Sequence, residues 1–350
     1  MAKTGIVRDV RYLDHQANTY HPESHHRLEV IHQMLQEPGM KGKFVEIQPR
    51  LAVREELELI HVPRYVQFVA ATAERDYAML DPDTYACPKS YETARLAAGG
   101  VLVAVDQVMA GTVDNVFAFI RPPGHHAEAS RAMGFCLFNN VAIAAAYAIR
   151  KHKIHRILII DWDLHHGNGT QHSFYENPEV LYFSTHQFPY YPGTGSVNEV
   201  GNGKGQGFTV NVPLTPGPGD AEYMHIFEEI LEPIALEYKP DLVFVSAGFD
   251  IYYQDPLGGM QVTPAGFANL TKIILGFSEK TCQGKVVFLL EGGYHLEGLR
   301  DSAREVLKTQ QGEVLTKGRD ENLRKVADKQ MVGPIIRKVK EAQKPFWKLG

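Results

Sequence analysis

The decisive stretch of this sequence reads Ile157-Leu158-Ile159-Ile160-Asp161-Trp162-Asp163-Leu164-His165-His166-Gly167. Four apolar residues come first, and Asp161, Asp163 and His165 follow at every second position. Alternate residues of an extended strand project from one face. Two carboxylates and an imidazole that converge where a buried strand ends predict a divalent-metal site. Oxygen and nitrogen ligands suit zinc, with iron or manganese as alternatives.

Three further apolar runs also lead into polar clusters. The runs span 116–120, 242–245 and 286–290, and the clusters that follow span 121–126, 246–250 and 291–294. Helical patterns lie between the runs, over 91–109, 140–151, 221–238 and 264–280, with Asp220 and Thr263 as expected N-caps. Continuous apolar runs are typical of parallel strands covered on both faces. The sequence therefore predicts an α/β fold with a mainly parallel sheet, helices on both faces, and chemistry at the carboxyl ends of its strands.

The composition is that of an ordinary globular chain. At 350 residues, with 44% hydrophobic and 22% charged residues, it has room for one large domain or two smaller ones. We favour a single domain over 1–350, because no Gly/Ser/Pro linker interrupts the chain and the clusters range from 121 to 294. Neither a membrane-spanning run nor a signal-peptide core is present, so we expect a cytoplasmic protein with no membrane partner.

Three cysteines without a CxxC pair indicate reduced thiols, so any metal must be held by His, Asp or Glu. Residues 301–350 form a mildly basic helical segment, with 12 Lys and Arg against 7 Asp and Glu in a chain of net charge −5. We favour a solvated surface for this segment, packed on the domain or extending from it. An acidic partner or a second subunit of a homo-oligomer is the alternative. No basic block with interleaved aromatic residues predicts a nucleic-acid partner.

Seven motifs follow one another along the chain. They are Arg-Pro-Pro-Gly-His-His at 121–126, Asp-Trp-Asp-Leu-His-His-Gly at 161–167, Phe-Pro-Tyr-Tyr-Pro-Gly-Thr-Gly at 188–195, Asn-Val-Pro at 211–213, Ala-Gly-Phe-Asp at 247–250, Asp-Pro-Leu-Gly-Gly at 255–259 and Glu-Gly-Gly-Tyr at 291–294. In this order the chain resembles the zinc-dependent histone deacetylase family, which includes acetylpolyamine amidohydrolases and acetoin-utilisation proteins. The resemblance covers about 5–302 and implies the arginase–deacetylase fold, with about eight strands. Asn168, where class I members have Asp, and the motifs at 247–259 resemble the class II and bacterial branch.

The resemblance implies one zinc per chain, held by Asp163, His165 and Asp250, with an open position for water and substrate. Iron in the cell is the alternative metal. A related ureohydrolase would need a second metal and bridging carboxylates, which the sequence does not offer beside Asp163 and His165.

The resemblance also implies the catalytic residues. His126 is the expected general base and then the acid to the leaving amine, and His125 gives electrostatic support. Asp161 backs His125, while Asn168 faces His126 and should leave it less basic than a carboxylate would. Tyr294 is expected to donate to the oxyanion.

Five further positions match the family's substrate tunnel. Phe135 and Tyr191 are expected to form its walls, with Gly134 leaving backbone room, Leu257 at the mouth and His21 near the substrate. A role in the core is the alternative for Phe135, Tyr191 and Leu257.

Two monovalent-cation sites of the family imply structural K⁺. One would use the Asp161 carboxylate, Ser184, and main-chain oxygens of Asp163, His165 and Thr185; the second would involve Phe174, Asn177, Val180 and Phe208.

We therefore expect a zinc-dependent deacylase that hydrolyses the amide of an N-ε-acyl-lysine, in a peptide, a protein or a small acylated amine. An acetylpolyamine amidohydrolase is the enzymatic alternative. A catalytically silent acyl-lysine-binding scaffold is the alternative from another class.

Overall fold

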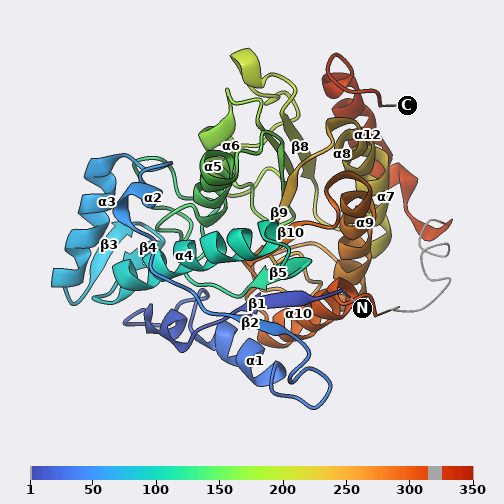
Figure 1. The fold of residues 1–350 in the computed structure, drawn as a ribbon. Helices are drawn as coiled ribbons and strands as arrows, with labels where there is room; N and C mark the ends of the chain where they lie inside the picture. The colour runs from blue at the N-terminus through green and yellow to red at the C-terminus, as the bar shows by residue number, and fades with distance from the viewer. Residues whose placement is uncertain (1, 314–324, 350) are drawn as a thin grey trace.

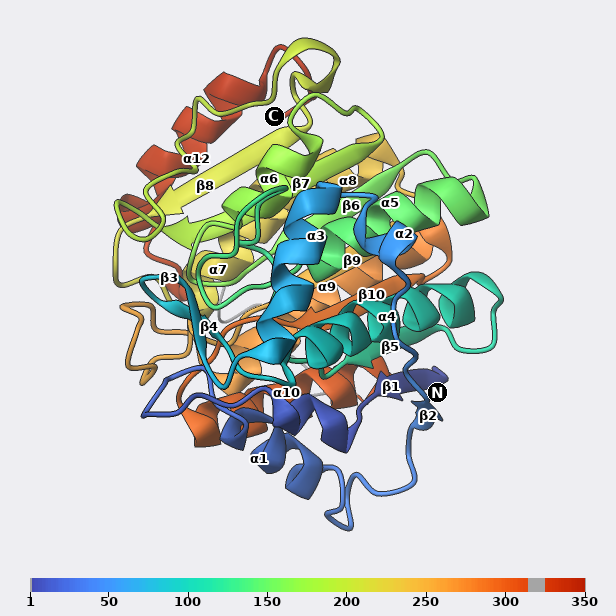
Figure 2. The same cartoon turned by 90° about the vertical axis from the view of Figure 1, so that its left-hand side faces the viewer.

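A single parallel sheet forms the centre of the molecule. The computed structural model describes residues 2–313 and 325–349. Eight strands lie in the order β2-β1-β5-β10-β9-β6-β7-β8, and every neighbouring pair is parallel (Figure 1 and Figure 2). Their bounds are β1 Thr4–Val7, β2 Val45–Ile47, β5 Asn115–Ala118, β6 Ile157–Asp161, β7 Val180–Gln187, β8 Thr209–Leu214, β9 Leu242–Ala247 and β10 Val286–Leu290. A separate antiparallel hairpin joins β3 Ala78–Asp81 to β4 Thr84–Ala86.

Helices cover both faces of the sheet (Figure 1). On one face lie α4 Ser90–Met109 and α5 Asn140–His152, and on the other α7 Asp220–Ile226, α8 Glu232–Tyr238, α9 Pro264–Cys282 and α10 Leu296–Gln310. The described part of the chain also contains the helices α1 His26–Met34, α2 Arg54–Leu57, α3 Pro63–Ala70, α6 Asn168–Phe174 and α12 Lys329–Gln343. Strands β5, β6, β9 and β10 are buried throughout, as continuous apolar runs between two helical layers require. The predicted α/β architecture is confirmed.

Of the two residues predicted as helix N-caps, one is confirmed and one is wrong. Thr263 caps α9 as expected, with its hydroxyl accepting from the Gly266 N–H. Asp220, in contrast, is the first residue inside α7 rather than its N-cap. The Asp220 carboxylate accepts from both the backbone N–H and the hydroxyl of Thr263, each at 2.7 Å, so it ties α7 to the start of α9. The helix predicted over 221–238 contains a π-helical segment, Phe227–Leu231, between α7 and α8.

The register of the central strands gathers the polar clusters at one edge. Asp161, the last residue of β6, pairs with Ser246 of β9 and Ser184 of β7. Leu290, the last residue of β10, pairs with Ala247 of β9. The loops after these strands therefore leave the sheet side by side, at the carboxyl ends where ligands bind parallel α/β sheets.

The described part of the C-terminal segment packs along the edge strand β8 (Figure 2). The Gln343 amide of α12 donates to the Thr209 carbonyl at 2.8 Å, and Lys340 pairs with Glu229 at 2.6 Å. Residues 314–324 of the predicted basic segment lie outside the described residues. Among the described residues, no helix combines the length and apolar character needed to cross a membrane.

Candidate active site

Three buried side chains converge beyond the ends of β6 and β9. The His165 Nδ1 lies 3.2 Å from Asp163 Oδ1 and 3.1 Å from Asp250 Oδ2, and one ligand atom of each residue lies within 4.8 Å of the others. Strand β6 ends at Asp161, so Asp163 and His165 stand in the following bends and not on one strand face as expected. The structure nevertheless brings together the three residues predicted as metal ligands.

Two glycines leave room for the two carboxylates. A Cβ on Gly248 would lie 2.2 Å from Asp163 Oδ2, and one on Gly292 would lie 2.4 Å from Asp250 Oδ2. Both distances are far below any ordinary contact. The Gly292 N–H also donates to Asp163 Oδ2 at 2.8 Å. The backbone is therefore shaped around these carboxylates, and two oxygens with one imidazole nitrogen fit the three protein ligands of a catalytic zinc.

The two carboxylates beside His165 create a negative potential that favours binding of a cation. Burial opposes a charge on His165, but hydrogen bonds to Asp163 and Asp250 outweigh it and raise its pKa to about 9. Burial and the Asp163 carboxylate raise the pKa of Asp250 to about 7. The two aspartates favour a proton on His165, and a divalent metal would satisfy the same demand.

The first histidine of the pair at 125–126 is held by a carboxylate. The His125 Nδ1 lies 3.0 Å from Asp161 Oδ2, and Asp161 also accepts from the Tyr182 hydroxyl at 3.0 Å. Burial lowers the pKa of His125, but Asp161 and Asp163 outweigh it and raise the pKa to about 10. His125 is therefore cationic at neutral pH.

The second histidine is in a different environment. The His126 Nδ1 lies 2.8 Å from Asn168 Oδ1, an uncharged partner. Burial, together with the positive charges of His125 and His165, holds the pKa of His126 well below its usual range. One imidazole of the pair is thus charged and the other neutral, which separates an electrostatic group from a base.

A cavity of about 180 Å³ opens onto this cluster. It is lined by Asp83, His126, Gly134, Phe135, His165, Tyr190, Tyr191, Leu257 and Tyr294. The Phe135 ring lies edge-on to Tyr294 at 5.9 Å, and Tyr191 lies edge-on to His126 at 5.1 Å. Gly134 has a φ of 57°, and a Cβ there would lie 2.3 Å from the His126 ring, so glycine is required. The cavity is a short aromatic tunnel that ends at the histidines.

Tyr294 is oriented by its backbone and its ring. Its N–H donates to Asp255 at 2.7 Å, and the Arg27 guanidinium lies 5.1 Å from the ring centroid. Burial and the nearby Asp250 carboxylate raise the pKa of Tyr294 well above its ordinary value. The hydroxyl therefore stays protonated and available as a donor.

The other predicted substrate residues divide into two groups. Leu257 lines the cavity, whereas His21 lies behind its wall, with its ring edge-on to Phe135 at 4.7 Å. Sequence reasoning missed Tyr190, although it precedes Tyr191 in the same motif; its ring stacks on His165 at 5.6 Å. Asp83 is the carboxylate in the lining, held by the Thr84 hydroxyl at 2.7 Å.

Two partners of the histidines also went unrecognised in the sequence. Glu291 is fully buried and accepts from the N–H groups of Gly124 and His125 at 2.7 and 3.2 Å. Tyr182 reaches Asp161 from the middle of β7. Glu291 opens the motif at 291–294, which was the available signal, whereas Tyr182 gave none because it reads as an ordinary apolar strand residue.

The residues predicted for K⁺ fall into two neighbourhoods. Ser184 and Thr185 lie in β7, where Ser184 pairs with Asp161, and the Thr185 hydroxyl is buried without a hydrogen-bond partner among the described residues. Phe174, Asn177 and Val180 form the turn between α6 and β7, and Phe208 accepts from the Tyr182 N–H nearby. K⁺ at either position stays a prediction.

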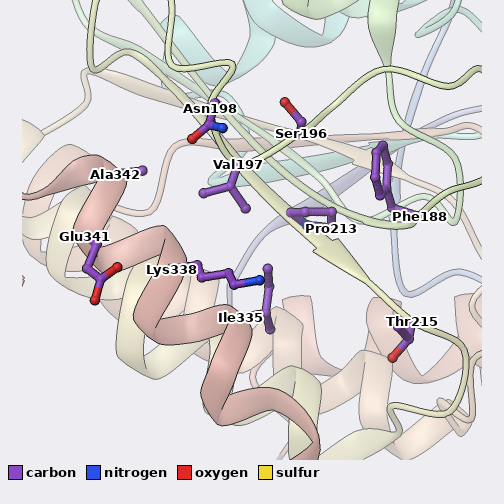
Figure 3. Close-up of a pocket in the computed structure, with 10 residues that line it drawn as sticks. All are labelled: Phe188, Ser196, Val197, Asn198, Pro213, Thr215, Ile335, Lys338, Glu341 and Ala342. Atoms are coloured by element: carbon purple, nitrogen blue, oxygen red, sulfur yellow. The ribbon is translucent and has the colours of Figure 1, made fainter.

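Two other features lie outside the tunnel. His25, His26 and Glu29 form a second group with ligand spacing at the start of α1, where His26 is exposed and the other two are half-buried. A larger cavity of about 610 Å³ lies between α12 and the loop after β7 (Figure 3). Its lining combines apolar and uncharged polar residues with two charged residues, Lys338 and Glu341.

Comparisons with known proteins agree with this geometry. A family profile described as the histone deacetylase domain matches residues 21–310. A probable deacetylase of Archaeoglobus fulgidus is 42% identical over 297 residues, which cover 84% of this chain and 82% of that protein. The human polyamine deacetylase HDAC10 is 43% identical over 299 residues, covering 82% of this chain and 44% of that protein. The crystal structure of the HDA15 HD domain superposes with a TM-score of 0.90 at 38% identity, covering 99% of this chain and 95% of that one.

Fold and site together define a hydrolase of the arginase–deacetylase fold. The chain belongs to the histone deacetylase family. It spans most of the archaeal relative but less than half of human HDAC10.

Proposed function

We propose that this chain is a zinc-dependent deacylase that hydrolyses the amide of an N-ε-acyl-lysine. The main support is that Asp163, His165 and Asp250 converge beside a tunnel. His165 lines this tunnel together with His126 and Tyr294. Asp163, His165 and Asp250 would hold the zinc and leave a position open. When bound, zinc supplies a Lewis acid that polarises the amide carbonyl and makes a water more acidic.

The two histidines divide the proton chemistry. Neutral His126 takes the proton from the attacking water and passes it to the leaving amine. Cationic His125 stays charged against Asp161 and stabilises the negative charge that develops nearby. Their opposite protonation supports these roles, because a base must start without the proton that it accepts.

Tyr294 provides the remaining donor. Tyr294 lines the tunnel, and its protonated hydroxyl donates to the amide oxygen as negative charge builds there. The aromatic walls of Phe135 and Tyr191 bury the methylenes of the lysine stem and exclude water.

A polyamine substrate is the second candidate. One relative is named as a polyamine deacetylase, and Asp83 places a carboxylate in the tunnel lining. Two other carboxylates that could bind a cationic amine are already engaged: Glu23 is buried against Arg121, and Asp255 accepts from the Tyr294 N–H. Leu257, on the same lining, is apolar and favours acyl-lysine.

A catalytically silent scaffold is disfavoured, because it would not need a neutral base, a charged partner and a phenol donor around one site. Structural K⁺, a cytoplasmic location and the choice between zinc and iron stay predictions.

The deciding experiment is matched kinetics of the zinc-loaded protein on an acetyl-lysine peptide and on acetylputrescine. We expect the larger kcat/KM for the peptide. A protein at least tenfold better on acetylputrescine would make the polyamine the substrate, and no zinc-dependent turnover of either would remove the enzymatic proposal.

A further inference from the structure

A chain of hydrogen bonds leads from His126 to the surface. The His126 Nδ1 lies 2.8 Å from Asn168 Oδ1. The Asn168 Nδ2 donates to Glu128 Oε1, and Glu128 Oε1 also contacts His172 Nδ1 at 2.8 Å. His126 and Asn168 are buried, whereas the Glu128 and His172 side chains are 20% and 49% exposed.

The direction of this chain is set at Asn168. Its amide group has two donor hydrogens on Nδ2, and these face the Glu128 carboxylate and the His126 carbonyl, the latter at 3.2 Å. Neither group can donate when Glu128 is ionised. Turning the amide over would set its oxygen against two acceptors and leave buried polar atoms unpaired, which is costly. Glu128 therefore keeps Asn168 Oδ1 pointing at His126.

The orientation of Asn168 decides the tautomer of His126. A carbonyl oxygen accepts, so the His126 Nδ1 must carry the hydrogen, and the Nε2 keeps its lone pair. The lone pair at Nε2 is the one available to a reaction in the tunnel, because Nδ1 is occupied by Asn168.

Glu128 is suited to this task. Burial raises the pKa of this carboxyl, but hydrogen bonds from His172 and Asn168 outweigh it and lower the pKa. Its backbone is fixed in a bridge to Arg131, where the Glu128 N–H donates to the Arg131 carbonyl at 2.9 Å. The loop that carries His126 thus also carries, two residues later, the carboxylate that orients its partner.

We propose that Glu128 is a positioning residue, which fixes the Asn168 amide and through it the tautomer in which His126 serves as a base. The proposal rests on the proposed function for its kinetic consequence, but the tautomer itself is a property of the protein alone.

The test replaces the carboxylate by an isosteric amide. In Glu128→Gln the new side chain can donate as well as accept, so Asn168 can turn over and His126 can adopt the other tautomer. We expect kcat to fall by about 10-fold or more, with KM little changed. The loss should stay smaller than the roughly 10⁴-fold loss that a wrong histidine tautomer causes in a catalytic triad, because only part of the His126 population changes tautomer. The matched control is Glu179→Gln, which breaks a second surface Glu–His pair, with His155 at 2.9 Å, at the start of β7. The control should keep the parent kcat.

A rescue variant separates positioning from structural support. Adding Asn168→Asp to Glu128→Gln places an acceptor-only group directly against His126 and should restore kcat to within about fivefold of the parent. The same Asn168→Asp change in the parent sets two carboxylates against each other and should lower kcat instead. A loss in Glu128→Gln that Asn168→Asp does not restore would overturn the proposal.

Nuclear magnetic resonance gives a readout that does not need activity. Imidazole ¹⁵N shifts of the metal-free protein, assigned by comparison with His126→Gln, should show hydrogen on Nδ1 in the parent and a mixture of tautomers in Glu128→Gln. Unchanged His126 shifts in Glu128→Gln would overturn the proposal, even if the parent proved inactive.

Discussion

A methyl group added at Gly292 should weaken metal binding although no proposed ligand is replaced. The Cβ of Gly292→Ala would lie 2.4 Å from Asp250 Oδ2 and 2.6 Å from Asp163 Oδ2. Since real Cβ contacts stay beyond about 3.0 Å, Asp250 must retreat by about 0.6 Å, several times the roughly 0.2 Å that metal–ligand distances tolerate. We expect zinc affinity to fall by about 10- to 100-fold, or about 1.4–2.8 kcal/mol. The φ of Gly292 is not in the left-handed region, so the backbone itself accepts alanine.

Competition for zinc against a chromophoric chelator measures this loss, and thermal denaturation checks the fold. Gly276→Ala is the matched control, because Gly276 lies in α9 with nothing within 4 Å of its would-be Cβ. The control should bind zinc like the parent and gain about 0.5–1 kcal/mol from helix propensity. A folded Gly292→Ala protein with the parent's zinc affinity would refute the assignment of these carboxylates to the metal.

Tyr294, Leu257 and His61 can each be tested by a single substitution. Tyr294→Phe should keep its metal but lose about 10²–10³ in kcat, the cost of one oxyanion donor, and a steady-state kcat within twofold of the parent would exclude that role. Leu257→Glu should move the ratio of kcat/KM towards acetylputrescine over the acetyl-lysine peptide, and an unchanged ratio would take Leu257 out of substrate selection. Burial lowers the pKa of His61 to about 4. His61 therefore contributes stability that is complete above its unfolded value near 6.5 and is lost as pH falls towards 4. The part due to His61 should be about 3 kcal/mol, and denaturant unfolding of the parent and of His61→Gln at pH 7 and pH 4 measures it as the difference between their losses.

The central strands could be predicted from the sequence because each is a continuous apolar run buried on both faces. The edge strand β2, Val45–Ile47, was not predicted, because it has only three residues and two of them are exposed. Strands β3 and β4 were not predicted either, because they are defined by their pairing with each other and not by a local apolar pattern. Such elements depend on tertiary contacts, which local periodicity does not report.

The apolar pattern placed Asp163, His165 and Asp250 at one edge of the sheet, because each follows a buried strand, and the resemblance then singled them out as the metal ligands. The spacing alone grouped Asp161 with Asp163 and His165, whereas the resemblance placed Asp161 behind His125. In the structure the Asp161 carboxylate contacts His125, because Asp161 still belongs to β6 and the chain bends only after it. Asp220 reads as an N-cap from its residue type, yet its partner is Thr263, 43 residues away. Partners distant in sequence leave no local signal.

In the proposed function, a metal held by Asp163, His165 and Asp250 drives amide hydrolysis. The most direct measurement is elemental analysis alongside turnover of an acetyl-lysine peptide, for the parent and for Asp250→Asn, before and after chelation and zinc return. We expect one zinc per chain, activity that is lost on chelation and restored by zinc, and neither zinc nor turnover in Asp250→Asn. Full turnover by the metal-free parent, or an Asp250→Asn protein with full zinc and unchanged activity, would contradict the proposed function.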